Sequence, residues 1–393
     1  MNITIYPGKL HGQINAIPSK SQAHRLLICA AFSDSPTTIF CPETNRDIEA
    51  TAGCLRALGA GITRTQDSYI VSPVSSYPEA ADLYCDESGS TLRFLLPIAG
   101  ALGTDTTFHM EGRLPKRPLS PLWEEMERMG CVLSRPTDTT IRCTGQLRPG
   151  KYSIDGSVSS QFITGLLFAL ALIPGNCNLA ITGKIESKPY ITMTENAIAA
   201  FRSNKNNTIP FHSPGNVQVE GDWSNAAFFH AANALGSDIT INGLDPDSAQ
   251  GDRAVMTCLK QLEQDTVISA ADIPDLVPIL AVTAGAKSGV LFTDIARLRL
   301  KESDRVATVV SMLKSLGAGA SPDENTLRIS HGTYKSCTID AAGDHRIAMA
   351  AAIAATVATG PVTILGAECV SKSYPSFWEE FKTLGGQYEQ HIR

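Results

Sequence analysis

The stretch RLRLKESDR, residues 297–305, encloses two carboxylates between cationic side chains. Lys301 lies next to Glu302, and Arg305 follows Asp304. A cation and a carboxylate that share one pocket with bound anions shift each other's pKa, which suits them to acid–base catalysis. The same residue types also form ordinary ion-pair clusters on protein surfaces, so both interpretations stay open at this point.

Cations also recur where apolar helices are expected to begin. The motifs are PSKSQAHR with Lys20 and Arg25, ESGSTLRF with Arg93, and GDHRIAM with Arg346. A helix N-terminus offers free N–H groups and a positive dipole end, so a cation is unfavourable there unless an anion binds. The sequence therefore predicts anion sites at these helix starts. The alternative is that Ser21, Ser90 and Asp344 are plain N-caps with solvated basic neighbours.

Three further motifs supply groups of the same kind. DGSVSSQF brings Ser159, Ser160 and Gln161 to another helix start, where they could donate hydrogen bonds to an oxyanion. RLPKRP places Arg117 in a stiff loop between two prolines, and SKSYPSF places Lys372 in a turn before a proline. Each motif alone is equally compatible with a capped helix or a solvated turn.

A repeated unit must position these motifs. An apolar helix and a short strand recur six times, starting at Ser21, Ser90, Ser159, Asp222, Asp275 and Asp344, with spacings of 69, 69, 63, 53 and 69 residues. An amphipathic helix and a further strand follow each copy. We expect the apolar helices to lie inside and the amphipathic ones to face water. The short fourth spacing predicts that a hairpin is missing there, and the alternation in RLRL predicts a strand before a capped helix.

Length and composition bound the class of protein. The 393 residues include 43% hydrophobic residues, enough for two domains. We expect a first lobe at residues 20–214, a second lobe at residues 1–11 and 222–393, and crossovers near residues 12–19 and 215–221. A net charge of −6 argues against a general nucleic-acid or membrane-surface binder.

Cysteine and histidine usage suggests neither a disulfide framework nor a metal site. The ten cysteines form no CxxC pair, and the eight histidines are scattered. The chain begins MNITIYPG, without a basic or apolar leader, and its apolar runs are too short to span a bilayer. The sequence therefore predicts a cytoplasmic protein that binds no metal.

The motifs in their order resemble the EPSP synthase (3-phosphoshikimate 1-carboxyvinyltransferase) family of enolpyruvyl transferases. Those that carry the resemblance, over nearly the whole chain, are PSKSQAHR, ESGSTLR, RLPKRP, SVSSQF, SKPY, IPD, LKESDR, GDHR and SKSYP. The resemblance implies an α/β fold of two similar lobes, each of three βαβαββ repeats in an inside-out α/β barrel, with the active site in the cleft between them. It also implies a monomer without a cofactor, which is a target of glyphosate.

The implied reaction joins phosphoenolpyruvate to the 5-hydroxyl of shikimate 3-phosphate and releases phosphate through a tetrahedral intermediate. Residues implied for phosphoenolpyruvate are Lys20, Gly89, Arg93, Arg117, Gln161, Arg305, Arg346 and Lys372. Those implied for shikimate 3-phosphate are Ser21, Arg25, Ser159, Ser160, Gln161, Ser187, Tyr190, Asp275 and Lys301. The catalytic residues implied are Asp275 as general base with Lys301, Glu302 as proton donor to C3, and His345 beside the departing phosphate. Arg297 stands where many relatives have asparagine.

Two alternatives remain at this point. The related UDP-N-acetylglucosamine enolpyruvyl transferases have a cysteine in a glycine-rich loop, whereas the comparable HMEGRLPKRPLS has none. RNA 3′-phosphate cyclases contain related repeats, but the acidic net charge and the few aromatic residues near the basic motifs argue against RNA.

Overall fold

The computed structural model describes residues 1–202 and 211–391. The chain divides into two compact units, a terminal unit of Met1–Ile17 with Gly221–Arg393 and a central unit of Pro18–Glu220. The first strand belongs to the terminal unit because it pairs with two strands near the other end of the chain. Residues 203–210, which precede the crossover predicted near residues 215–221, lie outside the described residues.

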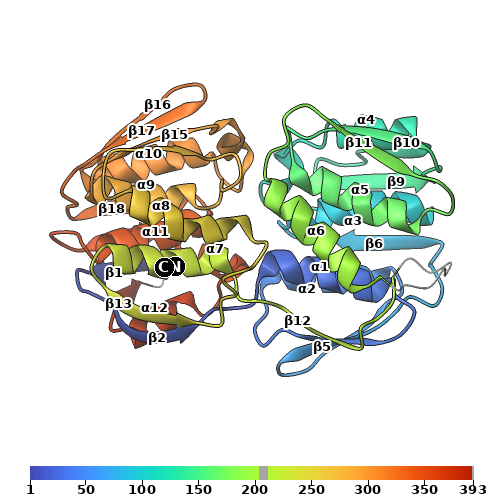
Figure 1. The fold of residues 1–393 in the computed structure, drawn as a ribbon, viewed down its shortest axis with the longest axis horizontal. Coiled ribbons are helices and arrows are strands. Elements are labelled where there is room, and N and C mark those ends of the chain that lie inside the picture. The colour runs from blue at the N-terminus through green and yellow to red at the C-terminus, as the bar shows by residue number, and fades with distance from the viewer. Residues whose placement is uncertain (203–210, 392–393) are drawn as a thin grey trace. The chain divides into compact units, whose positions relative to one another are not determined.

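The central unit alternates helices with short strands (Figure 1). Its helices are α1 (Lys20–Ala31), α2 (Arg46–Ala57), α3 (Gly89–Leu102), η1 (Leu114–Lys116), α4 (Leu122–Arg128), α5 (Ser160–Leu172) and α6 (Lys188–Ala200). Its strands are β3 (Thr37–Phe40), β4 (Gly61–Arg64), β5 (Ser68–Ser72), β6 (Ala80–Tyr84), β7 (Asp105–His109), β8 (Cys131–Ser134), β9 (Thr140–Gly145), β10 (Lys151–Asp155), β11 (Asn178–Thr182) and β12 (Asn216–Gln218).

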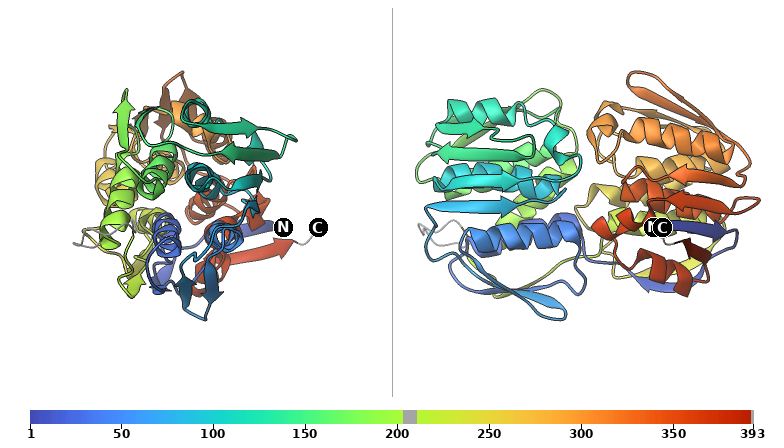
Figure 2. Two further views of the ribbon diagram at one scale, coloured as in Figure 1. Left: turned by 90° about the vertical axis from the view of Figure 1, so that its right-hand side faces the viewer. Right: turned by 180° about the vertical axis from the view of Figure 1, so that it is seen from behind.

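The terminal unit repeats the same alternation (Figure 2). Its helices are α7 (Trp223–Ala234), η2 (Gly251–Ala254), α8 (Val255–Gln261), α9 (Val277–Ala286), η3 (Ala296–Leu300), α10 (Arg305–Leu316), α11 (His345–Ala355), η4 (Ala367–Lys372) and α12 (Phe377–Thr383). Its strands are β1 (Asn2–Tyr6), β2 (His11–Asn15), β13 (Asp238–Asn242), β14 (Val267–Ser269), β15 (Val290–Thr293), β16 (Gly319–Pro322), β17 (Thr326–Ser330), β18 (Cys337–Asp340), β19 (Val362–Leu365) and β20 (Gln387–His391).

The sheets show the same design in both units. The described strands of the central unit form sheets β12-β3-β5-β4, β6-β7-β9-β8 and β10-β11, and those of the terminal unit form β18-β19-β1-β20, β14-β15-β17-β16 and β13-β2. Each four-stranded sheet has one parallel pairing followed by two antiparallel pairings. This repetition confirms the predicted α/β class with two similar lobes of repeated units.

Apolar helices form the interior of each unit, as predicted. Every residue of α11 is buried, and α3 leaves only Ser90 and Leu102 partly exposed. Inside the central unit α3 packs against α5, and inside the terminal unit α11 packs against α9. Burial of these helices removes large apolar areas from water, at about 25 cal/mol per Å², and so makes them the rigid supports for whatever their ends carry.

Side-chain caps start the helices, but two of the caps considered in the alternative interpretation were misplaced. Asp344 caps α11 as in that alternative, whereas α1 and α3 are capped by Ser19 and Ser88 instead of Ser21 and Ser90. Ser159, which was expected to donate to an oxyanion, accepts a hydrogen bond as the cap of α5. Helices α1 and α3 therefore begin two residues earlier than expected. This shift places Lys20 and Gly89 at the first helical positions, where backbone N–H groups point out of the helix towards a site suited to anions.

The fourth repeat is shorter than the others, as its spacing predicts. Only β14 lies between α8 and α9, whereas three strands lie at the corresponding place between α2 and α3, between α4 and α5, and between α10 and α11. The strand predicted at RLRL is wrong, because residues 296–300 form the 3-10 helix η3. Asp294 adopts a φ of 58° and ends the strand, after which Ile295 and Leu298 are buried with the three-residue period of a 3-10 turn.

Among the described residues, every helix is too short or too polar to cross a lipid bilayer.

A close helix contact gives a test of this packing. A Cβ atom on Gly165 of α5 would lie 2.2 Å from the backbone oxygen of Arg93 in α3, so Gly165→Ala should destabilise the protein by about 1–3 kcal/mol. Gly53→Ala on the exposed face of α2 meets no atom within 4 Å and should be neutral or stabilising by up to about 1 kcal/mol. Urea unfolding of both variants measures the difference, and equal midpoints would contradict the packing described.

Candidate functional site

Arg25 lies buried in the central unit among neutral oxygens. Its Nε donates to Thr194 Oγ1 at 2.9 Å, and its Nη2 donates to the Tyr190 carbonyl at 2.9 Å. Its Nη1 donates to the carbonyl of Ser21, so residues from α1 and α6 meet at this guanidinium. Among the described residues Arg25 has no carboxylate partner, and burial lowers its pKa to about 10. A buried cation held in this way is suited to an anionic ligand.

Lys20 lies at the first position of α1 and has a different environment. Its Nζ is 2.7 Å from Oδ2 of Asp47, a buried residue in the first turn of α2. Asp47 was not among the predicted site residues. The sequence did offer one indication of Asp47, because NRDIEA places an acidic residue in the first turn of a helix, two positions after the N-cap Asn45.

A second group in the central unit surrounds the start of α3. Arg93 Nη1 donates to Gln161 Oε1 at 3.0 Å, and Gln161 Nε2 donates to Ser90 Oγ at 3.0 Å. A Cβ atom on Gly89 would lie 2.6 Å from Arg117 Nη1 and 2.7 Å from Arg93 Nη1. The absence of a side chain at Gly89 therefore lets two guanidinium groups approach a helix N-terminus.

The remaining predicted residues of the central unit also lie at helix starts. Ser159 caps α5 by accepting from the N–H of Gln161, and Ser160 is the first residue of that helix. Ser187 precedes α6 and has a φ of 55°, which is uncommon for a residue other than glycine. Tyr190 follows in the first turn of α6. Such backbone strain is often retained at ligand-binding positions.

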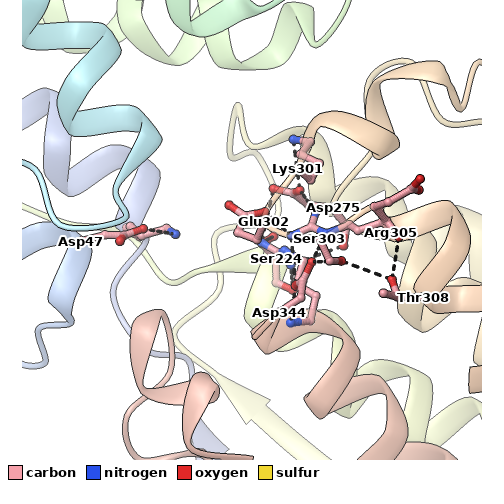
Figure 3. Close-up of polar contacts among 12 residues, drawn as sticks. Asp47, Ser224, Asp275, Lys301, Glu302, Ser303, Arg305, Thr308 and Asp344 are labelled. Carbon is pink, nitrogen blue, oxygen red and sulfur yellow. Dashed lines mark hydrogen bonds and ion pairs between the residues drawn. The ribbon is translucent and has the colours of Figure 1, made fainter. Parts of the chain in front are cut away.

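Asp275 is the meeting point of three cations in the terminal unit (Figure 3). Its Oδ1 lies 2.6 Å from Arg305 Nη1 and 3.3 Å from Lys301 Nζ, and its Oδ2 lies 3.4 Å from Arg346 Nη2. Burial opposes ionisation of Asp275, but Arg346, Lys301 and Arg305 outweigh it and hold the pKa of the carboxyl well below its usual value.

Arg305 binds two further carboxylates of the same unit. Its Nη2 lies 2.7 Å from Glu302 Oε2, and its Nε lies 2.8 Å from Asp344 Oδ2. Asp344 is fully buried and also accepts from Ser303 Oγ at 2.9 Å and from the N–H of Arg346. The motifs LKESDR, IPD and GDHR are therefore brought together, and the surface-cluster alternative does not apply to Arg305, which is 1% exposed.

Neighbouring residues complete this charge cluster. Arg346 Nη2 donates to Ser224 Oγ at 2.6 Å, and burial raises the pKa of the nearby Asp252 carboxyl to about 6. His345 is the first residue of α11, and Lys372 ends η4, which packs against that helix. Neither Ser224 nor Asp252 was predicted, because no charge pattern in the sequence marks either residue.

Lys301 and Asp252 are the groups of this cluster whose pKa values are shifted towards neutral pH. Burial lowers the pKa of Lys301 to about 8, although the Asp275 carboxylate partly opposes this effect. An amine with this pKa is present in both protonation states near neutral pH, which is the condition for efficient proton transfer. Within the described residues, no group of three or more histidines, cysteines or acids is placed to hold a metal ion.

The lowered pKa of Lys301 can be measured by acylation. The reaction needs the neutral amine, so its rate at Lys301 should rise with pH to a midpoint near 8 in the folded protein. In denaturant the midpoint should return to about 10.4, the ordinary value of lysine. Mass spectrometry of peptides after short reagent pulses gives both curves, and a folded midpoint equal to the denatured one would contradict the cluster described.

Comparisons with known proteins identify the family. The family model for EPSP synthase (3-phosphoshikimate 1-carboxyvinyltransferase) matches residues 5–381. The chain is 38% identical to the 3-phosphoshikimate 1-carboxyvinyltransferase of Clostridium kluyveri, over 99% of this chain and 98% of that one, and 35% identical to that of Clostridioides difficile, over 99% and 98%.

Solved structures share the fold at lower identity. EPSP synthase from Acinetobacter baumannii matches with a TM-score of 0.79 and 22% identity over 100% of both chains. The enolpyruvyl transferase NikO from Streptomyces tendae matches with a TM-score of 0.74 and 18% identity over 100% of this chain and 99% of that one. The family match and the full-length relatives establish that this chain belongs to the EPSP synthase (3-phosphoshikimate 1-carboxyvinyltransferase) family.

Proposed function

We propose that the protein transfers the enolpyruvyl group of phosphoenolpyruvate to the 5-hydroxyl of shikimate 3-phosphate and releases phosphate. Membership of the EPSP synthase family supports this activity. The structural observation that carries the proposal is Arg25, a buried cation held by neutral oxygens at the start of an apolar helix. Such a group favours a strongly anionic substrate over a neutral one.

The two substrates together carry about six negative charges near neutral pH, which repel one another. In this proposal phosphoenolpyruvate is bound by cationic side chains, by one amide side chain and by the start of α3, where Gly89 has no side chain. These residues are Lys20, Gly89, Arg93, Arg117, Gln161, Arg305, Arg346 and Lys372. Shikimate 3-phosphate is bound by Ser21, Arg25, Ser159, Ser160, Gln161, Ser187, Tyr190, Asp275 and Lys301. Helix N–H groups and guanidinium groups replace the water that the substrates lose.

The terminal unit would supply the acid–base chemistry. The 5-hydroxyl oxygen attacks C2 of phosphoenolpyruvate as its proton passes to Asp275 and Lys301, and C3 gains a proton from Glu302. The intermediate then loses phosphate as the Glu302 carboxylate takes back a proton from C3, which leaves the enolpyruvyl ether. Asp275 alone is a weak base because three cations depress its pKa, so the neutral form of Lys301 is the better proton acceptor of the pair.

Glu302 needs a change of partner before it can donate a proton. Its carboxylate is ion-paired with Arg305 at 2.7 Å, which favours the charged form. When the anion of phosphoenolpyruvate binds Arg305, it competes with Glu302 for the same guanidinium. Loss of that ion pair raises the proton affinity of Glu302 as the substrate arrives. His345, beside Asp344 at the start of α11, would assist the departing phosphate.

We further propose that the enzyme works in the cytoplasm as a monomer without a cofactor, and that neither nucleic acid nor a membrane is its partner. The acidic net charge supports the exclusion of nucleic acid, because binding to phosphate backbones requires a basic surface.

Phosphate release tests the reaction directly. The purified protein should release phosphate from phosphoenolpyruvate when shikimate 3-phosphate is present, and should release none with either substrate alone. UDP-N-acetylglucosamine should not replace shikimate 3-phosphate. Release with the nucleotide sugar, or release from neither mixture, would disprove the proposed function.

Two isosteric substitutions separate catalysis from binding. Asp275→Asn and Glu302→Gln should each lower kcat by about 10²–10⁴-fold, because each removes a proton-transfer group while leaving side-chain shape unchanged. The KM values for both substrates should change far less than kcat. Glu379→Gln on the exposed face of α12 is the matched control and should retain normal turnover. Near-normal kcat in either site variant would overturn its assigned role.

A further inference from the structure

A chain of hydrogen bonds connects helices α1, α2 and α3 of the central unit. His24 Nδ1 of α1 lies 2.7 Å from Thr51 Oγ1 of α2, which lies 2.7 Å from Thr91 Oγ1 of α3. Thr91 Oγ1 donates to Ser88 Oγ at 2.8 Å, and its other acceptor, at 3.4 Å, is the Asp47 carbonyl. We call His24, Thr51, Thr91 and Ser88 the relay. All four side chains are buried.

The acceptors of Thr91 determine which group donates in each hydrogen bond of the relay. Thr91 donates its single hydroxyl proton to Ser88 or to the Asp47 carbonyl, so it must accept from Thr51. Thr51 then has no second proton and must accept from His24. His24 is therefore the tautomer with its proton on Nδ1, and its Nε2 has no hydrogen-bond partner among the described residues.

The surroundings keep this imidazole neutral and fixed. Burial lowers the pKa of His24 to about 3, and the ring packs edge-on against Phe94 with ring centroids 6.2 Å apart. The cations Lys20 and Arg25 on the same helix also disfavour a positive charge on the ring, while Asp47 favours it. His24 thus acts as a permanent hydrogen-bond donor and takes no part in acid–base chemistry at neutral pH.

Each end of the relay lies next to a residue of the proposed phosphoenolpyruvate site. His24 follows Lys20 by one helical turn, and Thr51 follows Asp47 by one turn. Thr91 supplies two hydrogen bonds to Ser88, the N-cap directly before Gly89. Arg25 is next to His24 in the sequence, but it donates its hydrogen bonds to residues outside the relay, including Thr194 and the Tyr190 carbonyl. The hydrogen bonds of the relay therefore lead to the helix start at Ser88 and Gly89 and not to the Arg25 guanidinium.

We propose that His24 is a positioning residue. Its Nδ1–H donates a hydrogen bond to Thr51, Thr51 donates to Thr91, and Thr91 donates to Ser88, so that His24 fixes the phosphoenolpyruvate-binding helix start at Ser88 and Gly89. This inference rests on the proposed function, because that function assigns Lys20 and Gly89 to phosphoenolpyruvate. It predicts a specific effect on one substrate.

Two substitutions distinguish the ring nitrogens. The amide of asparagine reaches the position of Nδ1, whereas that of glutamine reaches the position of Nε2. His24→Gln should therefore raise KM for phosphoenolpyruvate about tenfold, the effect of losing one buried hydrogen bond, and His24→Asn should keep it within about twofold. In both variants KM for shikimate 3-phosphate should stay near the wild-type value.

A reciprocal control lies in the same unit. Thr194→Val removes the acceptor of Arg25 Nε and should raise KM for shikimate 3-phosphate more than KM for phosphoenolpyruvate. If His24→Gln changes both KM values equally, or if His24→Asn and His24→Gln behave alike, the positioning role is wrong. An inactive wild-type protein would instead refute the proposed function, so the two failures are distinguishable.

A spectroscopic measurement tests the inference without any measurement of activity. Nitrogen-15 NMR of the imidazole rings in the full chain should show one histidine with a protonated Nδ1 and a bare Nε2 that does not titrate down to pH 5. Loss of that signal in Thr51→Val would assign it to the relay. A His24 ring that is protonated on Nε2, or that titrates near pH 6.5, the ordinary value, would overturn the inference.

Discussion

Burial of positive charge at helix N-termini is the constraint on which both units depend. Arg25, Arg93, Arg305 and Arg346 are all nearly inaccessible to water. Arg25, Arg93 and Arg346 lie in the first two turns of buried helices, and Arg305 is the first residue of the half-buried helix α10, so the helix dipole disfavours a cation at these positions. The central unit surrounds Arg25 with hydroxyl and carbonyl oxygens, which satisfy its donors without neutralising its charge. The terminal unit surrounds Arg305 with three carboxylates. One unit therefore holds an uncompensated charge ready for an anion, and the other holds a balanced cluster in which an anion would displace a carboxylate.

In each unit the buried helices provide a rigid support, and the residues at their N-terminal turns provide the charged groups. Apolar helices such as α3 and α11 are buried along almost their whole length, so their packing fixes the position of their N-terminal turns. Caps such as Ser88 and Asp344 then orient the first backbone N–H groups. Asp344 has a second role, because the same carboxylate that caps α11 binds Arg305. Removing either function would leave a buried charge or buried donors without partners, which is strongly unfavourable.

Features that depend on residues close together in the sequence could be predicted from it. Contacts between helices far apart in the sequence could not. The repeat spacing predicted the helices and the missing fourth hairpin, since both follow from local periodicity. The strand at RLRL was wrong because alternation over four residues also fits a 3-10 turn once Asp294 ends β15. Ser19 and Ser88 were missed as caps because another serine stands two residues later in each motif. The partnership of Lys20 with Asp47 and the relay from His24 join helices far apart in sequence, so no local pattern could reveal them.

In the proposed reaction the carbon–oxygen bond of phosphoenolpyruvate breaks while the enolpyruvyl group moves to a second anionic substrate. Phosphoenolpyruvate labelled with oxygen-18 in the bridge between C2 and phosphorus shows which bond breaks. With shikimate 3-phosphate present, the released phosphate should carry the label and the enolpyruvyl ether should carry none. Label that remains with a pyruvate product would show cleavage of the phosphorus–oxygen bond, and the protein would then not be an enolpyruvyl transferase.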